Sequence, residues 1–292
     1  MSDDTGQLWQ VSLGGPLARL KAWAAARDHL DDPPWLALSV FDTKPPEGAV
    51  QLLFAGRDGA EAFVTGRDYA PDWRVDCARL SDENWVAKSL RGLPVVRAGR
   101  FYVYGAHHDA PDDDALAGVL IDAGEAFGSG HHGTTKGCLL AFEDRLDGAA
   151  PATVLDLGTG AGTLAIAAAM ALPDAVILAT DIDPVAVRVA RDNAVLNGVA
   201  GRIDFFTASG FDHAVLARQR FELIFANILA GPLMAMAGPV CAALDPGGVV
   251  LLSGILDRQE EAVRRAYTRS GLAFERHYVL DEWRVLVMRK PV

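Results

Sequence analysis

The sequence VLDLGTGAGTLAIAAA, residues 154–169, decides the fold of this chain. It reads as an apolar strand, a turn that holds Gly158, Gly160 and Gly162, and an alanine-rich helix. Glycine is needed in such a turn because the backbone bends tightly and approaches a ligand closely, where a Cβ atom would obstruct it. A plain strand-to-helix turn would also account for the glycines, so the surrounding sequence has to decide between the two.

An acidic residue follows the glycine turn at a spacing typical of nucleotide-binding proteins. Asp181 ends the next predicted strand, AVILATD, where a carboxylate reaches the hydroxyl groups of a ribose. A dinucleotide-binding turn has a small residue where this chain has Thr163, and Asp156 would repel a pyrophosphate. The pattern resembles that of class I methyltransferases, whose cofactor S-adenosylmethionine is a cation without pyrophosphate. We therefore favour a methyltransferase over the alternative, a hydride-transferring dehydrogenase.

Strand and helix patterns alternate from residue 154 to the C-terminus, with helices predicted at 184–196 and 230–244 among others. This alternation predicts a mostly parallel sheet with helices on both faces. The ligand of such a sheet binds at the carboxyl ends of the strands. Asn227 ends the strand FELIFAN, so we expect it to contact the acceptor or the methionine group; capping of the next helix is the alternative. The residues after it, Ile228 to Ala230, offer no ring for stacking a flipped base, which favours an aliphatic amine as acceptor.

The N-terminal part of the chain shows a different pattern. Residues 8–80 follow a β-α-β-β-α-β order, with WLALSVF and AVQLLFA as its central strands, and this order predicts a ferredoxin-like fold. A helix that starts at Ser81 and two strand-like segments follow as a linker. The turn HHDAPDDDA in this linker is read as a solvated loop rather than a metal site, because its residues have no spacing that would bring them together. We predict domains at 1–80 and 125–292, with a linker at 81–124.

Composition limits the partners and the compartment. The chain of 292 residues has 27 Lys and Arg against 38 Asp and Glu, and a net charge of −11 would repel a nucleic-acid backbone. We therefore expect no direct nucleic-acid binding, and a basic partner is favoured. No apolar stretch of about 18 residues occurs, so we expect no membrane span and a cytoplasmic protein. The three cysteines lie far apart, so we predict neither disulfides nor a metal site.

Five segments together resemble one family. The segments AFGSGHHGTT, VLDLGTGAGTLAIAA, DIDPVAVRVARDNAVLNGV, ANILAGPL and PGGVVLLSGIL resemble, in this order, those of the PrmA family. This family comprises bacterial methyltransferases that modify ribosomal protein eleven of the large subunit. The resemblance is strong from about residue 85 to residue 256 and weaker in the N-terminal domain. The chain departs from the family pattern at Ser129, where Thr is usual, and at Thr159, where Cys is frequent.

The resemblance implies a class I methyltransferase domain with a mostly parallel, seven-stranded, Rossmann-like sheet. It also implies that the ferredoxin-like domain captures the ribosomal protein, whose lysine ε-amines and N-terminal α-amine accept methyl groups. The glycine loop 126–133 would fold over the methionine end of the cofactor, and Thr134 and Thr135 would cap the helix after it. An inert linker is the alternative for this loop. The predicted cofactor contacts are Phe127, Gly128, Thr135, Asp156, Gly158, Gly160, Gly162, Asp181 and Asn227.

Two other functions remain open at this point. One is a methyltransferase that acts on another protein or on a small amine, and the other is a module that binds S-adenosylmethionine without catalysis. The sequence does not define an oligomeric state or a general base. His131 and His132 are expected to shape the loop or face the substrate rather than to bind a metal.

Overall fold

The computed structural model describes residues 9–27, 34–35, 37–44, 46–54, 56–79, 95–106, 108–121, 132–146, 148 and 150–292. The chain divides into two compact units, Met1–Trp85 and Val86–Val292. The predicted helix that starts at Ser81 and the loop residues Phe127, Gly128 and His131 lie outside the described residues.

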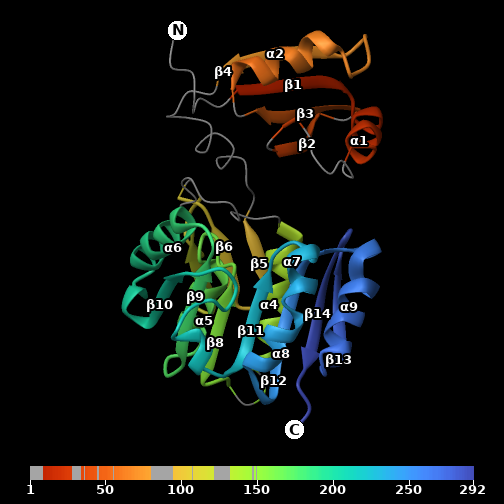
Figure 1. The fold of residues 1–292 in the computed structure, drawn as a ribbon. Helices are drawn as coiled ribbons and strands as arrows, with labels where there is room; N and C mark the ends of the chain where they lie inside the picture. The colour runs from red at the N-terminus through yellow and green to blue at the C-terminus, as the bar shows by residue number, and fades with distance from the viewer. Residues whose placement is uncertain are drawn as a thin grey trace. The chain divides into compact units, whose positions relative to one another are not determined.

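The described residues of the N-terminal unit form a four-stranded antiparallel sheet in the order β2-β3-β1-β4, with two helices. Alternate side chains of β1 and β3, such as Val11 and Leu52, are fully buried. Trp23 of α1 packs edge-on against Phe63 of α2, with ring centroids 6.3 Å apart. The predicted ferredoxin-like order is confirmed (Figure 1). The elements are β1 Trp9–Pro16, α1 Leu17–Ala25, β2 Ala37–Lys44, β3 Glu47–Phe54, α2 Arg57–Gly66 and β4 Arg74–Arg79.

The C-terminal unit contains a seven-stranded sheet in the order β10-β9-β8-β11-β12-β14-β13. The first five strands of this order are parallel, and β14 runs antiparallel to both of its neighbours. The predicted mostly parallel sheet of the class I methyltransferase fold is confirmed. The strands are β8 Thr153–Leu157, β9 Val176–Asp181, β10 Ile203–Thr207, β11 Phe221–Asn227, β12 Leu244–Leu256, β13 Ala273–Leu280 and β14 Trp283–Arg289.

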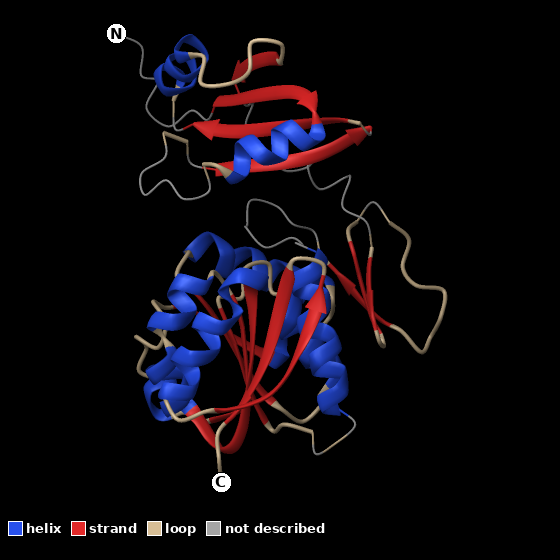
Figure 2. Ribbon diagram, turned by 90° about the vertical axis from the view of Figure 1, so that its right-hand side faces the viewer, coloured by secondary structure: helices blue, strands red, loops and turns tan. Residues whose placement is uncertain are grey.

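Helices cover both faces of this sheet (Figure 2). Residues from α4, α5 and α6 form one core with alternate strand residues, including Phe225. Residues from α7, α8 and α9 form the second core together with the strand residues that point to the other face, including Ile224. Because neighbouring strand residues point to opposite faces and both faces are covered, the central strands β8, β9, β11 and β12 have continuous runs of buried residues rather than an alternating pattern. The helices are α4 His132–Leu146, α5 Thr163–Ala171, α6 Pro184–Leu196, α7 Ala230–Ala235, α8 Ala237–Ala243 and α9 Glu260–Arg269, with short 3-10 turns η1 Ala200–Arg202, η2 Leu216–Arg218 and η3 Asp257–Gln259.

The helix predicted over residues 230–244 is in fact two helices. The chain turns at Met236, between α7 and α8. Pro239 explains the break, because its ring would clash with the carbonyl group of Ala235 in a continuous helix and it has no N–H to donate. The prediction of one helix was therefore wrong at this point.

A small three-stranded sheet belongs to the C-terminal unit. It contains β5 Val96–Ala98, β6 Phe101–Tyr104 and β7 Ala117–Leu120, which we predicted as part of the linker. Phe101 stacks on Phe142 of α4 with ring centroids 5.5 Å apart. Asn197, which follows α6, accepts a hydrogen bond from the backbone N–H of Leu120 and donates one to its carbonyl group. This sheet is therefore anchored on the helices of the large sheet.

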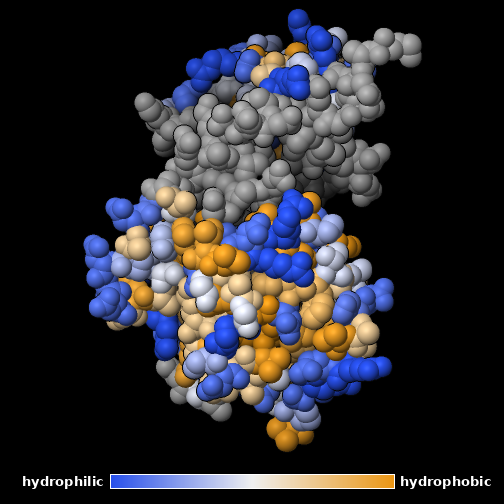
Figure 3. Space-filling view, turned by 90° about the vertical axis from the view of Figure 1, so that its left-hand side faces the viewer, coloured by the Kyte–Doolittle hydropathy of each residue, from blue (hydrophilic) through white to orange (hydrophobic). Residues whose placement is uncertain are grey.

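Figure 3 views the C-terminal unit from the side that carries α6 and β10 in Figure 1. Apolar side chains, drawn in orange, reach the surface there between charged ones. Val195 and Leu196 of α6 are exposed to 64% and 53%. In the part of the chain that the structure describes, no helix has the length and apolar character needed to span a membrane.

Candidate active site

The strand order places two predicted residues on either side of β8. Asp156 of β8 is paired with Ala179 of β9 and with Phe225 of β11. Asp181 and Asn227 each lie two residues further along those neighbouring strands. Since adjacent strands are about 4.8 Å apart, the two residues bracket the end of β8 at roughly 10 Å. This is the switch point of the sheet, where α/β proteins bind their ligands.

A cavity of about 570 Å³ opens at this point, a volume typical of sites for small ligands. The C-terminal ends of β8, β9 and β11 contribute to its wall, as does the first turn of α4. It brings together the predicted residues Thr135, Asp156, Gly158, Gly160, Asp181 and Asn227. Ile182 and Leu229 also line it and are each 71% exposed, so they lie at its mouth.

Asp156 holds the glycine turn against α5. Its Oδ2 atom accepts a 2.7 Å hydrogen bond from the Thr159 hydroxyl and a 3.0 Å bond from the Ala165 backbone N–H. The side chain is 1% exposed, and this burial raises the pKa of its carboxyl group from 3.8 to about 6, with a smaller contribution from the charge of Asp181. Asp156 therefore stabilises the turn through these hydrogen bonds and also places an acidic group beside the cavity.

Asp181 is tied to the same turn from the next strand. Its Oδ2 atom accepts the Gly160 N–H at 2.9 Å and its Oδ1 atom accepts the Asp183 N–H at 3.0 Å. Each carboxylate oxygen can accept more than one hydrogen bond. The side chain is therefore held in one orientation and can still accept bonds from two hydroxyl groups of a ligand.

Several glycines near the cavity have backbone conformations that other residues rarely adopt. Gly158, Gly162 and Gly254 have φ angles of +77°, +87° and +79°. A Cβ atom on Gly158 would lie 2.3 Å from Ile228 Cγ2, and one on Gly254 would lie 2.2 Å from the Ile228 carbonyl oxygen. Gly158 thus allows the segment after Asn227 to pack tightly against the turn, and Gly254 allows the same segment to pack tightly against β12.

Gly162 has a different environment from the other glycines of the turn. It does not line the cavity. A Cβ atom there would lie 3.0 Å from Ala190 Cβ, so this glycine allows α6 to pack closely against the start of α5. The position of Gly162 therefore does not support the predicted contact with the cofactor, which stays a prediction.

The N-terminus of α4 differs from the prediction. The helix begins at His132, so Thr134 and Thr135 lie within its first turn and are not its caps. Both side chains are 5% exposed, and both residues line the cavity. Ser253, which is paired with Asn227 across β11 and β12, donates a 3.3 Å hydrogen bond to the Thr134 carbonyl group. The capping role was therefore wrong, although the threonines do lie at the cavity.

Trp283, which begins β14, lines the cavity and was not among the predicted site residues. No ring follows Asn227 directly in the sequence, and the fold supplies one from a strand that begins 56 residues further along the chain. The ionisable residues that line the cavity in the described part of the chain are Asp156, Asp181 and Asp183. No group of three or more His, Cys, Asp or Glu side chains among the described residues is arranged to hold a metal ion.

The strand order, the single antiparallel strand β14 and the cavity at the switch point define a class I methyltransferase dependent on S-adenosylmethionine. The family described as "Ribosomal protein L11 methyltransferase (PrmA)" matches residues 57–291. The chain belongs to this family.

Individual relatives agree with this assignment. A ribosomal protein L11 methyltransferase of Brucella abortus is 48% identical over 209 residues, which cover 71% of this chain and 73% of the relative. That of Allorhizobium ampelinum is 45% identical over 241 residues, covering 81% and 82% of the two chains. The crystal structure of a ribosomal protein L11 methylase from Lactobacillus delbrueckii superposes with a TM-score of 0.60 at 30% identity, covering 68% of this chain and 99% of that one.

Proposed function

We propose that this protein methylates amino groups of ribosomal protein L11, namely lysine ε-amines and the N-terminal α-amine, with S-adenosylmethionine as methyl donor. The observation that carries the proposal is the cavity at the switch point, with Asp181 and Asn227 on either side of the glycine turn. The chain's family membership supports the same reaction and the same substrate protein.

The residues of the cavity fit this cofactor. The Asp181 carboxylate has accepting capacity for two ribose hydroxyl groups. Gly160 presents backbone next to it, where there is no Cβ atom to obstruct a ligand. Asn227 and Thr135 provide polar groups on the other side of β8, where we place the methionine group and the acceptor. The three aspartates of the lining favour a cationic ligand.

The bound cofactor supplies an electrophilic methyl group, so the protein's main contribution is to align the acceptor nitrogen with it. We assign this alignment to Asn227, whose carboxamide stands at the end of β11. A lysine ε-amine has a pKa near 10.4, and holding it neutral at pH 7.4 costs about 4 kcal/mol. Burial next to a positive sulfonium lowers that pKa, so the proposal requires no dedicated base.

We assign capture of the ribosomal protein to the N-terminal domain, residues 1–80, and a hinge function to the part of the linker around residues 81–100. A net charge of −11 favours a basic partner, and modification of several amines requires that the substrate be presented in more than one orientation. Limited proteolysis that found no accessible site within residues 81–94 would contradict the hinge.

The decisive experiment is methyl transfer from labelled S-adenosylmethionine to purified ribosomal protein L11. We expect label in L11 with the wild-type protein and a loss of label with Asp181→Ala. A parallel reaction on a mixture of ribosomal proteins distinguishes the alternatives. Label in another protein would contradict the assigned substrate, and absence of label despite cofactor binding would contradict catalysis.

A further inference from the structure

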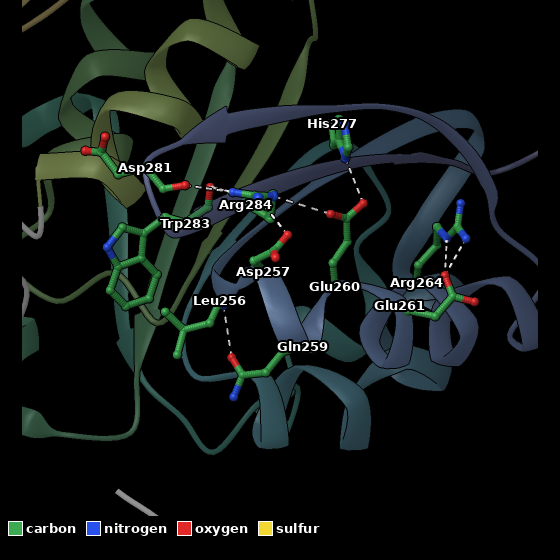
Figure 4. Close-up of polar contacts among 10 residues, drawn as sticks. All are labelled: Leu256, Asp257, Gln259, Glu260, Glu261, Arg264, His277, Asp281, Trp283 and Arg284. Carbon is green, nitrogen blue, oxygen red and sulfur yellow. Dashed lines mark hydrogen bonds and ion pairs between the residues drawn. The ribbon is translucent and has the colours of Figure 1, made fainter. Parts of the chain in front are cut away.

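Trp283 and Arg284 are consecutive residues of β14 with side chains on opposite sides. Trp283 lines the cavity, whereas Arg284 does not. Figure 4 shows the indole directed away from the guanidinium group, which reaches toward Asp257 and Glu260. This opposition follows from the alternation of side chains along a strand. The position of the ring in the cavity therefore depends on the contacts that hold β14.

The strands β13 and β14 form an antiparallel hairpin, with the turn before Trp283. Two glycines of α4 form the surface against which the start of β14 packs. Gly133 and Gly137 lie one helical turn apart, on one side of the helix. A Cβ atom on Gly133 would lie 2.8 Å from Trp283 Cδ1, and one on Gly137 would lie 2.5 Å from Val285 Cγ2. The start of β14 therefore lies directly on the helix backbone, which limits how the indole can move.

Arg284 fixes the hairpin from the other side. Its Nη1 atom donates to the carbonyl groups of Asp281 (2.9 Å) and Trp283 (3.0 Å). Its Nη2 atom donates to Asp257 Oδ1 at 2.6 Å, and its Nε atom lies 3.5 Å from Glu260 Oε2. The Arg284 side chain is only 13% exposed and that of Glu260 18%, whereas Asp257 is 70% exposed, so the contact with Glu260 is the better shielded of the two ion pairs. These contacts connect the backbone on both sides of the hairpin turn to η3 and α9.

The charges of the cavity are arranged unevenly. Its aspartates come from β8, β9 and the segment after β9, whereas the lining residues from β11, β12 and β14 carry no charge. An indole ring attracts a cation through its π face, and a buried ring does so more strongly than an exposed one. Trp283 is therefore the group on this side of the cavity that can distinguish a positively charged ligand from a neutral one.

We propose that Trp283 selects the cationic methyl donor over its neutral product, and that Arg284 is the positioning residue that holds the ring in place. This inference rests on the proposed function. In the transfer, the bond between the methyl carbon and sulfur breaks while a bond to the amine nitrogen forms. Sulfur keeps the electron pair and becomes a neutral thioether, and the new ammonium group loses its proton to water. The ring thus loses its cationic partner when the product forms.

The test compares the affinities of the full-length protein for S-adenosylmethionine and S-adenosylhomocysteine by calorimetry. In Trp283→Leu, we expect the Kd for the cationic donor to rise about tenfold and that for the neutral product to rise less than threefold. Trp283→Phe keeps a ring and should retain most of the preference. Equal losses for both ligands would overturn the inference, because they would mean that the ring contacts a part common to both. A wild-type protein that binds neither ligand would instead contradict the proposed function.

Arg284→Met tests the positioning role, because Arg284 does not contact the cavity. We expect the same selective loss as in Trp283→Leu, partial recovery in Arg284→Lys, and no further loss in the double variant Arg284→Met/Trp283→Leu. Additive losses, or equal losses for the two ligands, would show that Arg284 does not act through the ring. If thermal unfolding shows that Arg284→Met is not folded, Glu260→Gln, which keeps the size of the side chain, serves for the same comparison.

Discussion

Gly160 donates its backbone N–H to Asp181 Oδ2 at 2.9 Å, which ties the glycine turn after β8 to the carboxylate at the end of β9. Replacement of this carboxylate therefore removes a hydrogen-bond acceptor for the ligand and weakens the hydrogen bond that holds the turn. We expect Asp181→Asn to raise the Kd for S-adenosylmethionine by about 10- to 100-fold, measured by calorimetry.

Asp183 provides the matched control for Asp181. It also lines the cavity, but its Oδ1 atom accepts the Val185 N–H as the N-cap of α6. Asparagine caps a helix about as well as aspartate, so Asp183→Asn should change the Kd less than about threefold. Equal effects of the two substitutions would mean that general negative charge, and not the position of Asp181, determines affinity.

Asn227 is expected to act on turnover more than on binding. If its carboxamide aligns the acceptor, Asn227→Ala should lower kcat by about 100-fold while the Kd for S-adenosylmethionine rises less than tenfold. Methyl transfer to L11 under single-turnover conditions measures the first quantity, and calorimetry measures the second. Full turnover and full affinity in this variant would remove Asn227 from the mechanism.

Gly254 has very little room for a side chain. A Cβ atom there would lie 2.2 Å from the backbone oxygen of Ile228, and its φ angle of +79° is itself unfavourable for alanine. We expect Gly254→Ala to lower the free energy of unfolding by at least about 2 kcal/mol, measured by chemical denaturation.

The control for Gly254 is Gly231 of α7, where a Cβ atom would have no heavy atom within 4 Å outside the adjoining backbone. Alanine is the better helix former, so Gly231→Ala should leave stability unchanged or raise it by up to about 1 kcal/mol. A small effect at Gly254 would show that the segment after Asn227 can move away from β12.

The charge of Asp156 predicts how cofactor affinity depends on pH. Burial raises the pKa of this carboxyl group to about 6, so the group becomes neutral as the pH falls through that value. The attraction for a cationic ligand is then lost, and the affinity for S-adenosylmethionine should fall below about pH 6. In Asp156→Asn this step should be absent; a step that persists in the variant would come from another group.

The same carboxyl group predicts a dependence of stability on pH. Its pKa in the folded protein, about 6, lies above the value of 3.8 expected for the unfolded chain. Between these values the folded state binds more protons, so the contribution of Asp156 to stability should decrease as the pH rises and become constant above about pH 6. Relative to Asp156→Asn, the free energy of unfolding of the wild type should fall by about 3 kcal/mol over this range. A difference that rose with pH would contradict the assigned shift.

The elements that follow from local sequence were predicted well. The helix at 184–196 and the strand at 221–227 have the predicted bounds, because Asp183 and Pro184 define the start of the helix and residues 223–226 of the strand are all apolar. Asp181 and Asn227 could be found for the same reason, since the residue that ends a parallel strand lies at the ligand edge of the sheet.

The features that depend on contacts between distant segments could not be predicted. Trp283 reaches the cavity only because β14 inserts between β12 and β13, which no local pattern shows. The role of Gly162 depends on its distance to Ala190 in another helix, and the need for glycine at position 133 depends on the ring of Trp283. In each case the tertiary neighbour, and not the local sequence, determines the position.

The two ends of α6 serve different parts of the C-terminal unit. Asp183 at its start lines the cavity, and Asn197 at its end holds Leu120 through two hydrogen bonds. A helix of 13 residues is a stiff rod of about 20 Å. The helix therefore sets a fixed span between the small sheet and the rim of the cavity, so that the position of β7 and the position of Asp183 are built into one rigid element.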